Sequence, residues 1–152
     1  MPIIIHHRLR QVSFRLPVFR RLAQRLLDTI GEKSSELSIE LVGDRRMRRL
    51  NSRFRDMDRT TDVLAFALRD AKGPLSVLLG DVVISVPTAI RQARRFGHTV
   101  EEELVRLLIH GLLHLVGYDH ERGEREANRM RRKEQELWRS VQPLPRIVMS
   151  KE

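Results

Sequence analysis

Apolar residues recur along the chain with the periods of helices and strands. Between Pro17 and Gly31 they recur every three or four positions, which predicts an amphipathic helix that ends at the glycine. Its apolar face is expected to carry Val18, Leu22, Leu26 and Ile30. Alternation and short apolar runs predict strands over residues 3–9, 37–42, 62–68 and 78–86. Helix and strand patterns are mixed along the chain, so we expect one layered α+β or α/β domain over residues 1–152.

Three more helices of ordinary amphipathic character are expected. Asp44 is placed to cap a helix over residues 45–55. The inner face of that helix is expected to carry Met47, Leu50 and Phe54. A short helix over residues 87–96 stops at Gly97, and a last helix over residues 122–139 has a different apolar stripe. That stripe consists of Ala127, Met130, Leu137 and Trp138.

The helix between these two is apolar almost all round. Thr99 and Glu102 form a capping-box pattern at its start, and Gly117 can take the left-handed conformation that ends it after Val116. A helix of this composition is expected to be central and buried. Its only polar stripe carries Glu103, Arg106, His110 and His114. Any chemistry performed by this helix must therefore come from that stripe.

Histidines on and just beyond this helix suggest a metal site. His110 and His114 are four residues apart, so both imidazoles lie on one helical face, and His120 follows the glycine stop. Three imidazoles suit one zinc ion or a similar divalent ion and leave a coordination position open, as in catalytic sites. Unrelated core or surface histidines are the alternative, but burying two uncoordinated imidazoles would be costly. His6, His7 and His98 are expected at the surface.

The motif differs from that of His-Glu-x-x-His metalloproteases at one decisive position. Gly111 follows the first histidine where those proteases carry their glutamate base. This counts against peptide hydrolysis, and the glycine would let another element approach the helix closely. The general base would have to be Asp62, Asp81 or Asp119, a hydroxide bound to the metal ion, or a hydroxyl group of the substrate. Asp81 interrupts an apolar strand; Asp62 reads as a cap or turn residue, and Asp119 as a turn residue or a support for an imidazole.

The basic composition of the chain is compatible with a negatively charged partner. The net charge is +9, and arginine supplies 25 of the 29 basic residues, which suits bidentate contacts to phosphate but also fits a generally arginine-rich composition. Seven arginines and two acids lie between Arg45 and Arg59, where a basic face could follow a nucleic-acid backbone or simply be solvated. The candidate contacts to nucleic acid are Arg45, Arg46, Arg48, Arg49 and Arg59. The chain contains no cysteine, which fits the cytoplasm, and no apolar run long enough for a membrane span.

Several segments together resemble the YbeY family of bacterial endoribonucleases. The string from His110 to His120, His-Gly-Leu-Leu-His-Leu-Val-Gly-Tyr-Asp-His, is similar to the family signature. The arginine-containing segment 50–64 and the Leu-Gly-Asp strand at 79–85 also resemble those of the family. Where the family usually has Ser-Phe-Pro after Thr-Asp-Val-Leu, this chain has Ala65, Phe66 and Ala67.

The resemblance implies a fold, an activity and partners. It implies an α+β domain with a central, mostly parallel four-stranded sheet packed by about five helices. It further implies a zinc-dependent, single-strand-specific endoribonuclease that matures the 3′ end of small-subunit rRNA and acts in ribosome quality control. Arg55 corresponds to the family's important arginine and would clamp a phosphate. Implied partners are single-stranded RNA, the small ribosomal subunit and ribosome-associated proteins.

Two other functions stay open at this level. The first is an RNA-binding ribosome-assembly factor whose metal is mainly structural, and the second is a metalloprotease-like hydrolase, which Gly111 disfavours. A coordination position open to water or phosphate would favour catalysis, whereas a fourth protein ligand would favour a structural metal.

Overall fold

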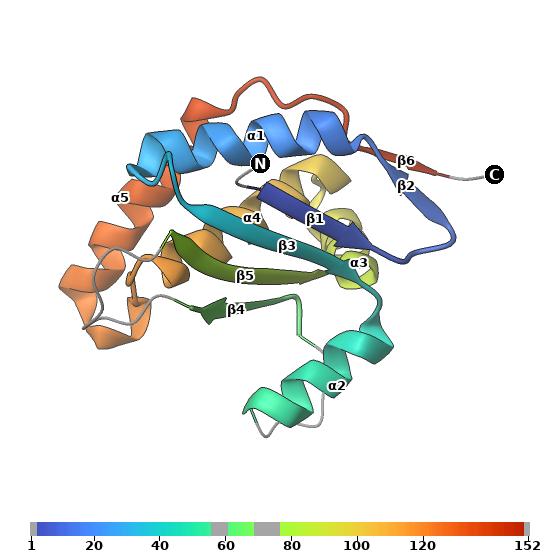
Figure 1. The fold of residues 1–152 in the computed structure, drawn as a ribbon, viewed down its shortest axis with the longest axis horizontal. Coiled ribbons are helices and arrows are strands. Elements are labelled where there is room, and N and C mark those ends of the chain that lie inside the picture. The colour runs from blue at the N-terminus through green and yellow to red at the C-terminus, as the bar shows by residue number, and fades with distance from the viewer. Residues whose placement is uncertain (1–2, 56–60, 69–76, 151–152) are drawn as a thin grey trace.

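The computed structural model describes residues 3–55, 61–68 and 77–150, apart from the side chains of Arg55, His120 and Ser150. Five α-helices, one short 3-10 helix and six strands lie within this part of the chain (Figure 1). The strands are β1 (Ile3–His7), β2 (Val12–Phe14), β3 (Glu36–Val42), β4 (Val63–Ala67), β5 (Leu78–Ser85) and β6 (Val148–Ser150). The helices are α1 (Leu16–Ile30), α2 (Asp44–Arg55), α3 (Val86–Phe96), α4 (Val100–Leu115), η1 (His120–Arg122) and α5 (Glu124–Ser140). Within the described residues, no helix is both long and apolar enough to cross a membrane.

Four strands form the central sheet in the order β1-β3-β5-β4. The pairs β1–β3 and β3–β5 are parallel, and β4 runs antiparallel to β5 at one edge. This arrangement confirms the expected α+β fold with a mostly parallel four-stranded sheet. Because β1, β3 and β5 are parallel, their carboxyl ends all meet at the same edge of the sheet, a common location for ligand sites in such folds.

Both faces of the sheet bury apolar side chains, but unequally. Val82 and Ile84 of β5 belong to the main core, which includes the apolar residues of α1 and α4. Val83 points to the opposite face, where it packs in a smaller cluster with Met47 of α2. In Figure 1, α4 lies behind the strands, and α2 lies beyond the end of β3. The helix expected to be central, α4, is therefore buried in the main core as predicted.

Sequence patterns missed one feature of the fold and misassigned another. β2 pairs antiparallel with β6, so residues 148–150 near the end of the chain add to a two-stranded ribbon beside the N-terminal region (Figure 1). These strands have three residues each, too few for a period to show. Phe54 was expected to point inward, but it is 57% exposed and packs edge-on against Phe66 with ring centroids 5.2 Å apart. The last turn of α2 extends past the small cluster, which leaves Phe54 uncovered.

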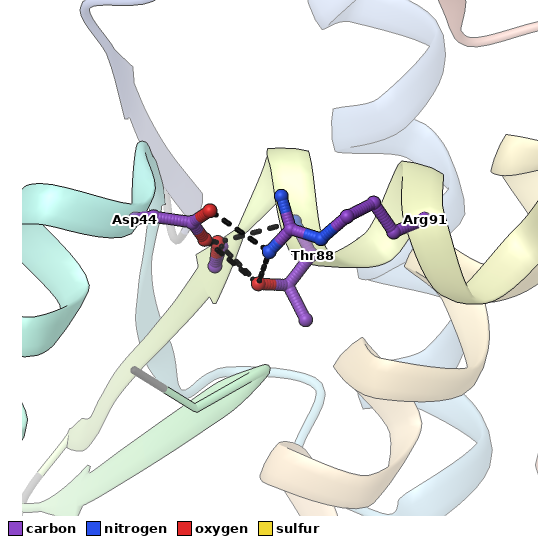
Figure 2. A network of polar contacts seen from close by, with 4 residues as sticks. Asp44, Thr88 and Arg91 are labelled. Carbon is purple, nitrogen blue, oxygen red and sulfur yellow. Dashed lines mark hydrogen bonds and ion pairs between the residues drawn. The ribbon is translucent and has the colours of Figure 1, made fainter. Parts of the chain in front are cut away.

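A polar network fixes the start of α2 to the start of α3 (Figure 2). Asp44 is the first residue of α2 rather than the capping residue before it, and its carboxylate contacts α3 instead. Asp44 Oδ1 accepts hydrogen bonds of 2.7 Å from the hydroxyls of Ser85 and Thr88. Asp44 Oδ2 accepts one of 2.8 Å from Arg91 Nη2. Ser85 also caps α3, so one cluster positions both helices at the carboxyl edge of the sheet.

The network changes the ionisation of its carboxylate. Partial burial opposes ionisation of Asp44, but the hydrogen bonds from its three neighbours and the charge of Arg91 outweigh that effect. The pKa of Asp44 therefore lies below its usual value of 3.8. A carboxylate with a lowered pKa stabilises the fold above its unfolded pKa, and this contribution disappears as the pH falls through the folded value.

We expect Asp44→Asn to lower the free energy of unfolding by about 1 kcal/mol at neutral pH, because it removes the charge that accepts these hydrogen bonds. The figure is modest because the Asp44 side chain is 35% exposed, so solvent screens the ion pair. The difference from wild type should shrink as the pH falls below 3.8 and disappear below the lowered pKa of Asp44, where the aspartate becomes neutral like the asparagine. Urea denaturation at a series of pH values measures it. Asp28→Asn, on the exposed side of α1, is the control, and a difference independent of pH would contradict the assignment.

Candidate functional site

The end of α4 is built to reverse the chain toward the histidine face of that helix. Gly117 has a φ of +99°, which side-chain-bearing residues rarely adopt. Gly117 N donates to His114 O at 3.1 Å and Tyr118 N donates to Leu113 O at 3.0 Å, the two hydrogen bonds of a Schellman motif. The glycine stop predicted from the sequence is confirmed, and the 3-10 helix that begins at His120 follows directly.

The two histidines of α4 converge. His110 Nε2 and His114 Nε2 are 3.1 Å apart, and the ring centroids are 4.6 Å apart at 77°. Both side chains are half-buried, so each has one side in the protein and one toward solvent. Spacing of four residues on a helix accounts for the convergence, as predicted. No group of three His, Asp or Glu side chains converges on one point among the described side chains, to which that of His120 does not belong.

A cleft of about 510 Å³ opens in front of this pair. One wall is the edge strand β4 with the residues just before it, and the other is α4 with the turn that follows. The lining residues include Thr61, Asp62, Val63, Leu64 and Ala65 on the first wall and His110, Gly111, His114, Tyr118, Asp119 and Arg122 on the second. Ala65 thus presents only a methyl group to the cleft. β4 pairs only with β5 within the described sheet, so its outer edge faces the cleft.

Gly111 sets the distance between the two walls. A Cβ atom at this position would lie 2.8 Å from Val82 Cγ1 and 3.4 Å from Val63 Cγ2. The helix therefore approaches β4 and β5 more closely than any larger residue allows, as expected from the sequence. The same contact leaves no room at position 111 for the glutamate of a His-Glu-x-x-His protease.

An ion pair between a buried glutamate and an exposed arginine continues the polar stripe of α4 behind the histidines. Glu103 is fully buried, and its two oxygens accept from Arg106 Nε at 2.9 Å and Nη2 at 2.6 Å. The hydrogen bonds that Arg106 donates to Glu103 raise the pKa of Arg106, and the charges of Asp62 and Glu134 act in the same direction. Such a bidentate pair satisfies a carboxylate that would otherwise be costly to bury. The polar residues of α4 thus form one continuous stripe, a polar seam along a helix whose other residues are mostly apolar and buried.

Asp62, which the sequence favours as a cap or turn residue over a possible base, lies in the cleft wall. Its backbone oxygen accepts from Ser85 N at 2.9 Å, which is the structural role expected. Its carboxylate lines the cleft and accepts from Gln92 Nε2 of α3 at 3.3 Å. The signal that could have identified it is its position immediately before an edge strand that faces the histidine helix.

Two other carboxylates lie where they serve different purposes. Asp119 Oδ1 accepts from Glu121 N at 2.9 Å, and Oδ2 lies 3.4 Å from Arg122 Nε, so both oxygens hold the turn after α4. Asp81 pairs in register with Ser38 and Phe66, and it lies on the same face of β5 as Val83, opposite to Val82 and α4. Asp81 is not among the residues that line the cleft. Strand alternation turns the Asp81 side chain away from the histidines, so this geometry gives no support to a catalytic Asp81, which stays a prediction.

The predicted basic residues follow α2. Arg55 is its last residue, and residues 56–60 separate it from Thr61 in the cleft wall. The structure describes the backbone of Arg55 but not its side chain, and Arg59 lies outside the described residues. Arg45, Arg46, Arg48 and Arg49 are all exposed on the first two turns. These four arginines therefore form an exposed helical face that begins after the carboxyl end of β3.

The fold and its histidine cleft define the class of this protein: an α+β protein with a site at the edge of a mixed sheet. The family model described as "Endoribonuclease YbeY" matches residues 5–142. The "Endoribonuclease YbeY" of Geobacter metallireducens is 43% identical over 141 residues, covering 91% of this chain and 94% of that protein. The protein of that name from Aquifex aeolicus is 42% identical, covering 82% of each chain. The chain therefore belongs to the YbeY endoribonuclease family.

A solved structure agrees at the level of the fold. The solution structure of TM1509 from Thermotoga maritima has a TM-score of 0.60 and 26% identity to this chain. The similarity covers 95% of this chain and 99% of that one. The family match over residues 5–142 includes every residue that lines the cleft.

We expect Gly111→Ala to destabilise the protein by about 1–3 kcal/mol, because the added methyl would overlap Val82. Alanine favours a helix by up to about 1 kcal/mol over glycine, so an overlap-free site would give the opposite sign. Urea denaturation measures the change. Val82→Ala provides the second arm of a double-mutant cycle, in which the cost of Gly111→Ala should fall. A Gly111→Ala protein as stable as wild type would contradict the close approach.

Proposed function

We propose that this chain is a metal-dependent endoribonuclease that cleaves single-stranded RNA. The observation that carries the proposal is the convergence of His110 and His114 in the cleft of a YbeY family member. In line with the resemblance, the proposed substrate is the 3′ region of small-subunit rRNA, and ribosome quality control is the proposed process. Association with the small ribosomal subunit would place this activity in the cytoplasm.

The histidine pair fits a divalent ion. Two nitrogens bound at 2.0–2.1 Å to one tetrahedral zinc ion lie about 3.3 Å apart, close to the 3.1 Å between His110 Nε2 and His114 Nε2. A hydrogen bond between two neutral rings would give a similar distance without a metal. The third donor we propose is His120, which the Schellman turn returns to the region of the cleft. One zinc ion per chain is the proposed cofactor, and other divalent ions suit the same donors.

The chemistry divides between the ion and the chain. When bound, the ion supplies a Lewis acid for the phosphoryl group. In line with the resemblance, Arg55 is proposed to pair with a phosphate oxygen and to offset the charge that develops there. Asp62 is the carboxylate best placed to accept a proton from an attacking hydroxyl, because it lines the cleft. Asp119 is proposed to support the site by holding the turn that carries His120.

The two alternative functions differ in support. No contact among the described residues favours a ribosome-assembly factor over an enzyme. A failed cleavage test would favour the assembly factor. Peptide hydrolysis by a His-Glu-x-x-His mechanism lacks its base, and the contact between Gly111 and Val82 leaves no space for one. The RNA-directed reading also agrees with the exposed arginines of α2.

We expect His114→Ala to abolish cleavage of a single-stranded rRNA fragment, because it removes one of the proposed ligands. Arg55→Ala should lower kcat by about 100-fold or more, as for the loss of one group that stabilises transition-state charge. A chelator should abolish wild-type cleavage, and added zinc should restore it. Product formation by highly purified protein is the measurement.

Matched substitutions separate these effects from general damage. His98→Ala, at an exposed histidine before α4, and Arg53→Ala, at an exposed arginine two residues before Arg55, should cleave like wild type. Equal cleavage by wild type, His114→Ala and Arg55→Ala would indicate a contaminating nuclease and remove the basis for catalysis. Bound zinc without any cleavage would favour the assembly factor with a structural metal.

A further inference from the structure

A second hollow lies away from the histidine cleft, at the carboxyl ends of β1 and β3. It encloses about 550 Å³. His6, His7 and Arg8 line it from the end of β1, and Arg46 and Arg49 line it from the first two turns of α2. We call it the β1–α2 groove. Sequence analysis placed His6 and His7 only at the surface, because nothing in the local pattern brings them next to residues 40 positions away.

The charge of this groove is strongly unbalanced. Glu40 is the only acidic residue among those that line it. Arg8, Arg46 and Arg49 are exposed, and none of them forms an ion pair with another residue in the described part of the chain. Cations that repel one another in a concave surface raise its affinity for anions. A solvated helix face would not need two separate segments to bring their cations into one hollow.

The position of the groove relates it to the cleft. β1 and β3 are parallel to β5, so the groove lies at the same edge of the sheet as residues 82–85 of β5. Residues 63–65 of the cleft wall pair with residues 82–84. Helix α2 begins beside the groove and ends at Arg55, which precedes Thr61 of the cleft wall in the sequence. From Arg46 to Arg55 the helix rises by roughly 14 Å, a distance that a short stretch of nucleic acid spans.

We propose that the β1–α2 groove binds the sugar-phosphate backbone of the RNA strand whose scissile bond lies in the histidine cleft. This inference rests on the proposed function. Guanidinium groups match phosphate oxygens bidentately, and imidazole N–H groups can donate to the same oxygens. The groove offers no exposed aromatic ring for stacking apart from its two imidazoles, so it holds the backbone rather than reading bases. The groove thereby favours substrates that extend beyond the cleaved bond on one side.

The test uses binding, which is independent of cleavage. The probe is fluorescein-labelled oligouridine of about 16 nucleotides, compared with one of about four nucleotides, in fluorescence anisotropy titrations over a range of salt. Arg8→Ala/Arg49→Ala should weaken binding of the long probe and reduce the slope of log K against log salt by about 1.4, since each lost contact to a single strand contributes about 0.7. Binding of the short probe should change much less.

Two matched variants act as controls. Arg21→Ala/Arg25→Ala removes the same charge from exposed positions on α1 and should leave the slope unchanged. Arg8→Lys/Arg49→Lys keeps the charge and should retain most of the slope. Circular dichroism melting of each variant establishes that it is folded, so a loss of binding by a folded protein is attributable to the groove.

The outcomes separate this inference from the proposed function. If wild type cleaves RNA but Arg8→Ala/Arg49→Ala keeps the wild-type slope and affinity, the groove proposal is overturned while the function stands. If wild type does not cleave, but the groove variant loses the slope, the groove still binds RNA and the proposed catalysis fails. Tighter, groove-dependent binding of a polyglutamate peptide than of oligouridine would identify an acidic protein as the occupant and overturn the proposal.

Discussion

The close contact between α4 and the β4–β5 pair is the constraint on which the rest of the site depends. Gly111 lets the helix backbone approach Val82 and Val63, which brings the histidine turn against the edge strand. With a larger residue the helix would have to move outward, and the cleft between β4 and the histidines would change its width. The residue that distinguishes this motif from a protease motif thus has a packing function of its own.

A second consequence of that packing is the polar seam along α4. A helix buried on nearly every side carries Glu103, Arg106, His110 and His114 in one line. At one end the exposed Arg106 neutralises the buried carboxylate of Glu103 through a bidentate ion pair, and at the other end the histidines line the cleft. The adjoining helices are fixed at the same edge of the sheet by the Asp44 network and by Ser85. The histidines therefore lie on a firmly packed helix, and the cleft in front of them is open.

Local patterns were sufficient for the longer helices and strands and for the histidine pair. The capping box at Thr99, the glycine stop at Gly117 and the spacing of His110 and His114 are all short-range features, so the sequence alone predicts them. Local patterns were not sufficient where a long-range contact decides which face of the sheet or which cleft a side chain lies on. The face on which Asp81 lies depends on which side of the sheet α4 covers, and the cleft position of Asp62 depends on strand order. The pairing of β2 with β6 joins segments too short and too distant to show a signal.

The central claim is that the histidine pair of α4 forms part of a divalent metal site. Isothermal titration of the purified, metal-free protein with zinc tests it most directly, with His110→Ala and the exposed-site variant His98→Ala measured alongside. The account predicts one ion per chain for wild type and His98→Ala, and at least about a tenfold loss of affinity for His110→Ala. Zinc binding of equal stoichiometry and affinity in all three proteins, or none in wild type, would contradict it.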